Sequence, residues 1–271
     1  MEPILLYAKE VAVEAVLAAG TVQLAKFKEA VFEVNDKDDA GDLVTEVDLL
    51  AEKEILERLQ YHFPDHQIRS EETGWSGAEG DWLWLVDPLD GTNNYAVGLP
   101  LFGVSVTLLY RKEPVLGVIY ETVTDRIYTA VRGQGAECNS NPLVQAAPRS
   151  SDIRKMTISW IQGHAVQKHP EAFKLKQYID LHCKRTLRLW APSLAWCLTA
   201  KGTLDGIVLY NSEGDDLYAG VLMVKEAGGI VMDFEGNEFS GMSKEPYLIA
   251  CHPDHKELML QLVRNGLAAD R

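Results

Sequence analysis

Hydrophobic and polar positions near the start of the chain follow the spacing of an amphipathic helix, which we predict over about residues 3–28. The apolar residues of its stripe are Ile4, Leu5, Ala8, Val11, Ala12, Leu17 and Val22. Two short apolar runs, 31–34 and 43–44, predict strands on either side of a polar tip at 35–41. Thr45 with Asp48 three positions later forms a weak capping-box pattern, which predicts a second helix to about residue 60.

Apolar strands dominate the middle of the chain. Residues 67–70 and 82–86 predict two strands, and the second of them runs directly into Asp87. Three further segments alternate or cluster like neighbouring antiparallel strands with turn residues between them: 103–110, 115–120 and 127–130.

Strands and helices alternate in the later part of the chain. Strands are predicted at 157–160, 206–209, 230–232 and 247–250, and helices near 171–182, 193–201, 216–227 and 254–265. Turn-rich segments at 139–142 and 148–151 indicate a boundary between them and the earlier strands. We therefore predict a mixed α/β chain in two halves, an α+β half over residues 1–145 and an α/β half over residues 146–271.

Composition narrows the class of protein. The 271 residues are 46% hydrophobic and 24% charged, as in an ordinary globular protein with a sizeable core. Apolar stretches are too short to cross a membrane, and Glu2, Glu10 and Glu14 make the start unlike a secretory signal. The four cysteines are scattered without a Cys-x-x-Cys pair, so we expect neither a disulfide framework nor a zinc site. A cytoplasmic protein without membrane contact is the expectation.

The formal net charge of −14 changes the picture of possible partners. Binding to DNA, RNA or an anionic membrane is disfavoured, because counterion release requires a basic face. If the substrate is itself an anion, a positive group has to lie between it and this protein. Divalent cations are the obvious candidates.

The most informative segment is Asp87-Pro-Leu-Asp90-Gly91-Thr92. An apolar strand delivers two carboxylates three residues apart, and Gly91 permits a tight turn and close backbone approach. Thr92 would open a short helix with free N–H groups for an anion, and the carboxylates suit Mg²⁺, which bridges to substrate phosphate. The alternative is a surface turn, because Asp-Gly is also a common hairpin signal.

Other acidic residues each have an ordinary explanation when taken singly. Glu71-Glu72 follow a strand and would form a solvated loop, while Asp48 and the pair Asp215-Asp216 would cap helices. Their joint occurrence with the segment at 87–92 is harder to explain in this way.

Taken together, four segments resemble the inositol monophosphatase family in order and near-family spacing, over about residues 40–230. They are Gly41-Asp-Leu-Val-Thr-Glu-Val-Asp48, Ser70-Glu-Glu72, Trp84-Leu-Val-Asp-Pro-Leu-Asp-Gly-Thr92 and Gly214-Asp-Asp216 with Glu226-Ala-Gly-Gly229. Gly133-Gln-Gly-Ala136 also matches the family's Gly-x-Gly-Ala turn. The resemblance implies a layered αβαβα sandwich like that of the lithium-sensitive phosphatases and fructose bisphosphatases, in a cytoplasmic enzyme that is commonly a homodimer.

The resemblance also implies a ligand set for Mg²⁺, held mostly by the first half and completed by the second. Glu71, Asp87 and the Leu89 carbonyl would hold one ion, and Asp87, Asp90 and Asp216 a second. A third, weaker ion would lie near Glu71 and water, with the family's third-ion loop falling near Lys37. Mn²⁺ would be a substitute, Li⁺ an inhibitor, and Ca²⁺ a further candidate inhibitor.

Catalysis is then expected to use water as the nucleophile. Asp48 would act as base through the Thr92 hydroxyl beside Glu71, and Gly91 and Thr92 N–H groups would grip phosphate. Asp90, Pro192 and Leu209 would complete the substrate pocket. No serine, cysteine or histidine nucleophile is needed, so Ser105, Ser193 and the seven histidines are interpreted as packing or surface residues.

Two departures from the family pattern concern the substrate end. Asp215 stands where family members usually have tryptophan, and could tune the metal site or face solvent. Leu209 stands where inositol-specific enzymes carry an acidic residue, and Arg188-Leu-Trp-Ala-Pro-Ser193 replaces the common Gly-Ser or Gly-Thr pair. We therefore expect hydrolysis of small sugar or polyol phosphates, with a loosely recognised alcohol bounded by Trp190 and Pro192.

Three alternatives stay open. The same scaffold could serve a fructose-1,6-bisphosphatase or a histidinol-phosphate phosphatase. A regulatory or binding protein with incidental phosphatase activity is the alternative of another class, although it could have lost Asp48 or Thr92, and both are present. A calcium-binding structural module is weaker, because its loop ligands would lie close together in sequence.

Overall fold

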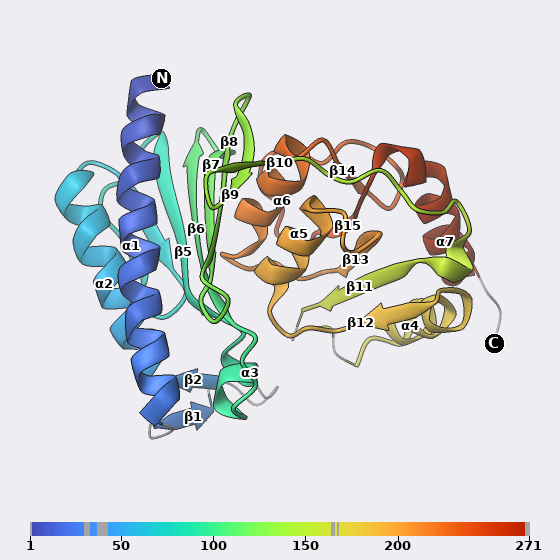
Figure 1. Ribbon diagram of the computed structural model, residues 1–271, viewed down its shortest axis with the longest axis horizontal. Coiled ribbons are helices and arrows are strands. Elements are labelled where there is room, and N and C mark those ends of the chain that lie inside the picture. The colour runs from blue at the N-terminus through green and yellow to red at the C-terminus, as the bar shows by residue number, and fades with distance from the viewer. Residues whose placement is uncertain (1, 30–32, 37–42, 164–165, 167, 269–271) are drawn as a thin grey trace.

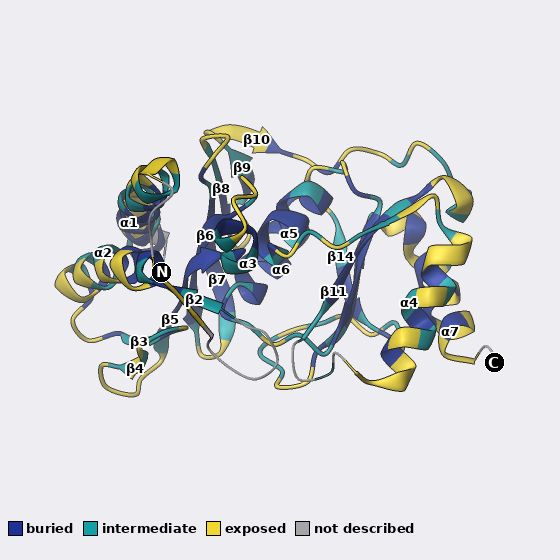
Figure 2. Ribbon diagram, turned by 90° about the horizontal axis from the view of Figure 1, so that it is seen from below, coloured by how far each residue is buried: buried dark blue, intermediate teal, exposed yellow. Residues whose placement is uncertain are grey.

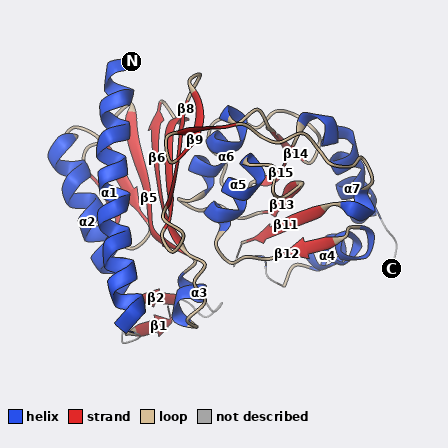
Figure 3. Cartoon of the chain, in the orientation of Figure 1, coloured by secondary structure: helices blue, strands red, loops and turns tan. Residues whose placement is uncertain are grey.

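A computed structural model describes residues 2–29, 33–36, 43–163, 166 and 168–268, and shows five layers in the order αβαβα (Figures 1 and 3). Two sheets lie roughly side by side, with helices outside each and between them. The layered mixed α/β fold predicted from the sequence is confirmed.

The first outer layer consists of α1 (Glu2–Glu29) and α2 (Glu46–His62). The capping box is present: Val47 N donates to the Thr45 hydroxyl, and Thr45 N donates to the Asp48 carboxylate. The buried faces of both helices pack with apolar residues of the first sheet in one core cluster. Figure 2 shows these faces dark against the sheet.

The first sheet has eight strands in the order β10-β9-β8-β7-β6-β5-β3-β4. Their bounds are β3 Gln67–Ser70, β4 Gly74–Ser76, β5 Trp82–Asp90, β6 Gly103–Tyr110, β7 Glu113–Glu121, β8 Arg126–Val131, β9 Gly135–Cys138 and β10 Asn141–Leu143. All neighbours are antiparallel except β3 and β5, which run parallel. The parallel pair brings the ends of β3 and β5, with Glu71 and Asp87, to the same edge of the sheet.

The middle layer consists of α5 (Pro192–Ala200) and α6 (Leu217–Glu226), which share a core with both sheets. The second sheet follows in the order β12-β11-β13-β15-β14. Its strands are β11 Thr157–Gln162, β12 Arg185–Leu187, β13 Gly206–Tyr210, β14 Ile230–Asp233 and β15 Tyr247–Cys251. Helices α4 (Pro170–His182) and α7 (Lys256–Ala268) cover its outer face through a third core.

Short elements complete the chain. Strands β1 (Val34–Asp36) and β2 (Leu43–Thr45) pair with each other, and α3 (Thr92–Ala96) follows β5. Two single 3-10 turns lie at Ile153–Lys155 and Pro253–His255. Residues 37–41 of the predicted polar tip, including Lys37, lie outside the described residues, as do residues 31 and 32 of the strand predicted before it. No helix in the described part of the chain is long and apolar enough to span a bilayer.

Candidate active site

A cleft of about 700 Å³ opens beside the ends of β3 and β5 and reaches the loops before α5 and α6. Of the predicted site residues, those that line it are Glu71, Asp87, Leu89, Asp90, Gly91, Thr92, Pro192 and Asp216. Asp48 lies behind this wall, 1% exposed, and reaches the cleft through Thr92. Segments more than a hundred residues apart in sequence thus meet in one place.

A bulge in β5 positions Asp87 and Asp90. The pairing of β5 with β6 shifts register between these two residues, so Pro88 and Leu89 leave the ladder. The Pro88 carbonyl accepts from Gln23 Nε2 of α1 at 2.8 Å, and the Asp87 carboxylate accepts from Leu89 N at 3.0 Å. The bulge is therefore held by hydrogen bonds from outside the sheet and from within its own loop.

Gly91 turns the chain from β5 into α3. Its φ of 94° lies in the left-handed region that favours glycine. A Cβ there would lie 2.9 Å from the Leu101 carbonyl oxygen and 3.2 Å from Ala191 Cβ. A side chain at this position would therefore clash, and the turn could not lie so close to the segment before α5.

Thr92 connects Asp48 to the cleft. Its hydroxyl lies 2.9 Å from Asp48 Oδ1 and 2.9 Å from the Leu89 carbonyl, and its single proton can serve only one acceptor at a time. Asp48 Oδ2 accepts from the Thr45 hydroxyl at 2.6 Å and from Thr45 N at 2.8 Å, which fixes the carboxylate. Burial raises the pKa of Asp48 to about 6, and the hydrogen bonds from Thr45 and Thr92 oppose that rise.

Asp90 has a partner that the sequence did not suggest. Ser193, at the start of α5, donates to Asp90 Oδ2 from its backbone N at 2.9 Å and also from its hydroxyl. Ser193 is fully buried, as the interpretation as a packing residue allows, but it also holds a carboxylate of the cleft, which the sequence did not suggest. A polar residue in the apolar first turn of α5 was the signal available. Ser105, by contrast, lies buried in β6.

Electrostatic repulsion concentrates at the carboxylates of the cleft. Burial and then the neighbouring Glu71 raise the pKa of Asp87 well above its ordinary value, and burial and then Asp216 do the same for Asp90. Burial and then Glu71 raise the pKa of Asp216 to about 7. A cation placed among these groups would relieve both the repulsion and the cost of burying charge.

The chemistry of this donor set fits a hard divalent cation, because carboxylate oxygens are its preferred ligands. As they stand, no three acidic, histidine or cysteine side chains within the described ranges are arranged to hold an ion. Hydrogen bonds from the protein already engage some of these carboxylate oxygens. Asp87 accepts from Leu89 N, and Asp90 accepts from Ser193 N. The carboxylates are nonetheless gathered in one cleft.

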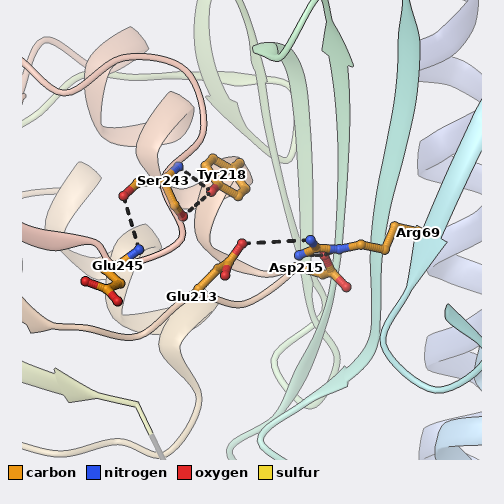
Figure 4. A network of polar contacts seen from close by, with 6 residues as sticks. All are labelled: Arg69, Glu213, Asp215, Tyr218, Ser243 and Glu245. Carbon is orange, nitrogen blue, oxygen red and sulfur yellow. Dashed lines mark hydrogen bonds and ion pairs between the residues drawn. The ribbon is translucent and has the colours of Figure 1, made fainter. Parts of the chain in front are cut away.

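Asp215 neither faces solvent nor stands alone. Its side chain is 7% exposed and accepts from Arg69 Nε of β3 at 2.6 Å, while Glu213 lies 3.8 Å from another nitrogen of the same guanidinium (Figure 4). Burial raises the pKa of Asp215 to about 6, opposed by Arg69. Arg69 also lies over the Trp75 ring, 5.7 Å from its centroid. Asp215 is thus joined to the strand that leads to Glu71.

The first turn of α6 is joined to a neighbouring segment as well. Tyr218, in the first turn of α6, donates its hydroxyl to the Ser243 carbonyl at 3.2 Å and accepts from Ser243 N at 3.1 Å (Figure 4). These two bonds fix the helix that begins directly after Asp216.

Leu209 does not take part in the cleft. It lies on β13, is 1% exposed and packs in the core between the two sheets. The expectation that Leu209 faces the substrate is therefore wrong. The wall at this end of the cleft is formed instead by Arg188, Trp190, Gln162, Ser212 and Glu213.

The glycine-rich turn at 133–136 and Glu226 belong together. The Glu226 carboxylate accepts from Gly133 N and from Gly135 N, each at 2.9 Å. These family-like segments therefore join α6 to the first sheet and lie away from the cleft.

Comparison with known proteins agrees with this architecture. The model of the inositol monophosphatase family matches residues 6–268. "Inositol monophosphatase 1" of Solanum lycopersicum is 33% identical over 263 residues, covering 94% of this chain and 93% of that protein. "Nus factor SuhB" of Pasteurella multocida is 34% identical over 197 residues, covering 72% of this chain and 73% of that protein.

A solved structure of similar fold is the extragenic suppressor protein suhB from Bartonella henselae. It superposes with a TM-score of 0.87 at 29% sequence identity, covering 96% of this chain and 99% of that one. The likeness thus extends over nearly the whole of both chains.

Proposed function

This chain belongs to the inositol monophosphatase family, and we propose that it hydrolyses small sugar or polyol phosphate monoesters in a Mg²⁺-dependent reaction. The observation that carries the proposal is the Thr92 hydroxyl, which lies 2.9 Å from a buried carboxylate and lines a cleft of clustered acidic residues. That arrangement places a proton acceptor beside carboxylates that would hold Mg²⁺, the two components that metal-dependent hydrolysis of a phosphate ester uses.

Two groups of residues would hold the ions. Glu71, Asp87 and the Leu89 carbonyl would ligate one Mg²⁺, and Asp87, Asp90 and Asp216 a second. When bound, Mg²⁺ supplies charge neutralisation at the phosphoryl group and lowers the pKa of water. We expect Mn²⁺ to replace Mg²⁺, and Li⁺ and Ca²⁺ to inhibit. Glu71 would also lie nearest to any third, weaker ion.

The chain's own residues would move the proton of the attacking water. When Thr92 donates to Asp48 Oδ1, the lone pairs of its hydroxyl are free to accept from a water in the cleft. As the water oxygen attacks phosphorus, its proton passes to Thr92 Oγ1 and the proton of Thr92 passes to Asp48. The P–O bond to the alcohol breaks, and the departing alkoxide takes a proton from a second water. Thr45 keeps Asp48 aligned throughout.

Binding of the phosphate would fall to the turn at Gly91 and Thr92. Their backbone N–H groups donate in none of the hydrogen bonds found for the described residues. Asp90 and Pro192 lie in the same wall.

The direct test is phosphate release from a panel of esters with and without Mg²⁺. The panel contains inositol 1-phosphate, fructose 1,6-bisphosphate, glycerol phosphates and histidinol phosphate. We expect Mg²⁺-dependent release from several of them within about two orders of magnitude in kcat/KM, whereas a preference above about 10⁴ would require a pocket that hydrogen-bonds one alcohol. Release that is unaffected by removing Mg²⁺ with a chelator would contradict the proposal.

A regulatory role is the second candidate, because a similar protein bears the name "Nus factor SuhB". In that case the metal site would be retained and turnover would be incidental. A purified protein that binds Mg²⁺ but releases no phosphate from any member of the panel would favour this second candidate. For either role we propose a cytoplasmic homodimer.

A further inference from the structure

Trp190 lies in the wall of the cleft in a backbone conformation that tryptophan rarely adopts. Its φ is 55°, in the left-handed region, and its side chain is 54% exposed. A bulky residue with positive φ is uncommon, and such residues are found where surrounding structure enforces them. Glycine or asparagine would occupy this position with less strain.

The residues on both sides of Trp190 are attached to the turn that carries Thr92. The carbonyl of Leu189 accepts from Asn94 Nδ2 at 2.7 Å, and Asn94 belongs to α3. Ala191 is fully buried against Gly91. Trp190 is thus fixed between two anchored neighbours, and it lines the cleft while staying half exposed instead of being packed into the core.

The indole of Trp190 is available to a ligand. Among the described residues, no ring and no guanidinium is stacked on it. The other exposed tryptophan of the cleft, Trp75, already has Arg69 over its ring. The cleft, at about 700 Å³, also leaves room beside the carboxylates for a ring system.

We propose that Trp190 stacks on a planar ring in the alcohol part of the substrate, so that esters of ring-bearing alcohols are preferred over plain polyol phosphates. The proposal rests on the proposed function and narrows its substrate class. An indole face offers only weak contacts to hydroxyl groups, so the hydroxyls of a polyol that lie against it exchange hydrogen bonds with water for weaker interactions. A planar heteroaromatic ring covers the same face without that loss and gains stacking.

The test compares adenosine 5′-monophosphate with ribose 5-phosphate, which carries an anomeric hydroxyl in place of the base. We expect the wild-type protein to favour the former in kcat/KM by about tenfold or more, because one stacked base contributes a factor of that order. The ratio should fall close to one in W190A and in W190N, and W190F should retain most of it. W190N tolerates positive φ, so it separates loss of the ring from backbone strain. F173A, which removes an equally exposed aromatic side chain from α4, is the matched control and should keep the wild-type ratio.

Binding of adenosine without phosphate, followed by calorimetry, makes the outcome independent of turnover. If no ester is hydrolysed but adenosine binds to the wild type and about tenfold more weakly to W190A, the proposed function fails and the role of Trp190 stands. A wild-type ratio near one, or a ratio that W190A leaves unchanged, overturns the role of Trp190. A change in association state of W190A by light scattering would also overturn it, because Trp190 would then contact a second copy of the chain.

Discussion

At the scale of single residues, Thr92 has one hydroxyl proton and two acceptors, Asp48 and the Leu89 carbonyl. Thr92→Ala removes the link between Asp48 and the cleft, and we expect kcat to fall by about 10²–10⁴, the usual range for a proton-transfer group. Thr92→Ser keeps the hydroxyl and should retain most of the activity. Steady-state kinetics at saturating Mg²⁺ measure both. Normal turnover combined with a large loss of Mg²⁺ affinity would reassign Thr92 to a structural role.

Asp87 gives a prediction in which activity and stability change in opposite directions. Asp87→Asn keeps an oxygen that can accept from Leu89 N but removes a buried charge next to Glu71. We expect less than about a tenth of wild-type turnover, a barrier increase above about 1.4 kcal/mol. In chelator, the melting temperature should rise by about 2–4 °C, which corresponds to a gain on the order of 1 kcal/mol.

Two controls define the Asp87 result. Asp81→Asn, in an exposed ion pair with Arg111 outside the cleft, should change neither quantity appreciably. If Asp87→Asn melts lower than the wild type in chelator, the carboxylate is needed for folding, and repulsion does not dominate there.

The contacts of Leu209 and Ser193 could not be predicted from the sequence. The spacing of Leu209 from Asp216 located it along β13, but spacing does not tell which face of a strand a side chain takes. Leu209 faces the core between the sheets, while its neighbours Val208 and Tyr210 face the outer core. Ser193 could not be assigned either, because its partner Asp90 lies 103 positions away. Long-range contacts of this kind depend on the assembled layers.

At the scale of elements, α1 stabilises the bulge of β5 through the hydrogen bonds of one buried glutamine. Gln23 is fully buried, donates to the carbonyls of Pro88 at 2.8 Å and Gly103 at 3.1 Å, and accepts from Thr122 at 2.6 Å. Gln23→Leu leaves these partners unsatisfied, and we expect a loss of about 3 kcal/mol in the free energy of unfolding.

Urea denaturation of Gln23→Leu measures this loss. Gln60→Leu makes the same substitution at an exposed position of α2 and should stay within about 0.5 kcal/mol of the wild type. Because Asp87 and Asp90 flank the bulge, turnover of Gln23→Leu should fall as well. A variant as stable as the wild type would show that water or repacking replaces the glutamine.

His66, which joins the end of α2 to β3 and β5, predicts a pH dependence of stability. Its ring stacks on Phe63 and Trp82, and its Nδ1 accepts from Trp84 Nε1 at 3.1 Å. Burial lowers the pKa of His66, opposed by Asp65, so folding favours the neutral ring. The unfolded chain therefore binds the proton more readily, and this contribution to stability is complete above about pH 6.5 and is lost as pH falls below it.

The His66 contribution can be isolated from the other titrating groups by a difference measurement. His66→Asn can still accept from Trp84 but doesn't titrate. The stability advantage of the wild type over His66→Asn should shrink as the pH is lowered from 7.5 to 5, followed by urea denaturation at each pH. A difference that stays constant over this range would contradict a lowered pKa.

Most elements could be predicted because their signals are local. The Thr45 capping box, the buried strand before Asp87 and the antiparallel run from β6 to β8 depend on neighbouring residues. Strands β4, β9, β10 and β12 were missed, and three of them, β4, β10 and β12, share a physical reason. Each of these three has three residues at the edge of a sheet, and β10 contains Pro142 in a segment that predicted a boundary. Such short edge strands form only because the neighbouring strand is already in place.

At the scale of the whole molecule, the cleft depends on how the segments before and after residue 145 are held together. Among the ion pairs found in the described part of the chain, only those of Arg69 join a residue before that position to one after it. Arg69 lies two residues before Glu71, and Asp215 directly precedes Asp216. The pair thus connects two segments that would each supply a ligand to Mg²⁺.

A purely electrostatic role and a positioning role make opposite predictions for Arg69→Met. If only charge mattered, Arg69→Met would strengthen Mg²⁺ binding by removing a nearby positive group, and Asp215→Asn would weaken it. If the pair positions Glu71 and Asp216, both substitutions weaken binding, and the double variant binds no more weakly than either single one. We expect the second pattern, with a loss of Mg²⁺ affinity of about three- to tenfold, or roughly 0.6–1.4 kcal/mol.

Calorimetric titration with Mg²⁺ measures this loss without depending on turnover. Arg132→Met breaks an exposed ion pair with Glu113 that has the same charges but lies away from the cleft, and it should leave Mg²⁺ affinity unchanged. If the two single variants changed Mg²⁺ affinity in opposite directions, Arg69 and Asp215 would act only through their charges. Other contacts would then position Glu71 and Asp216.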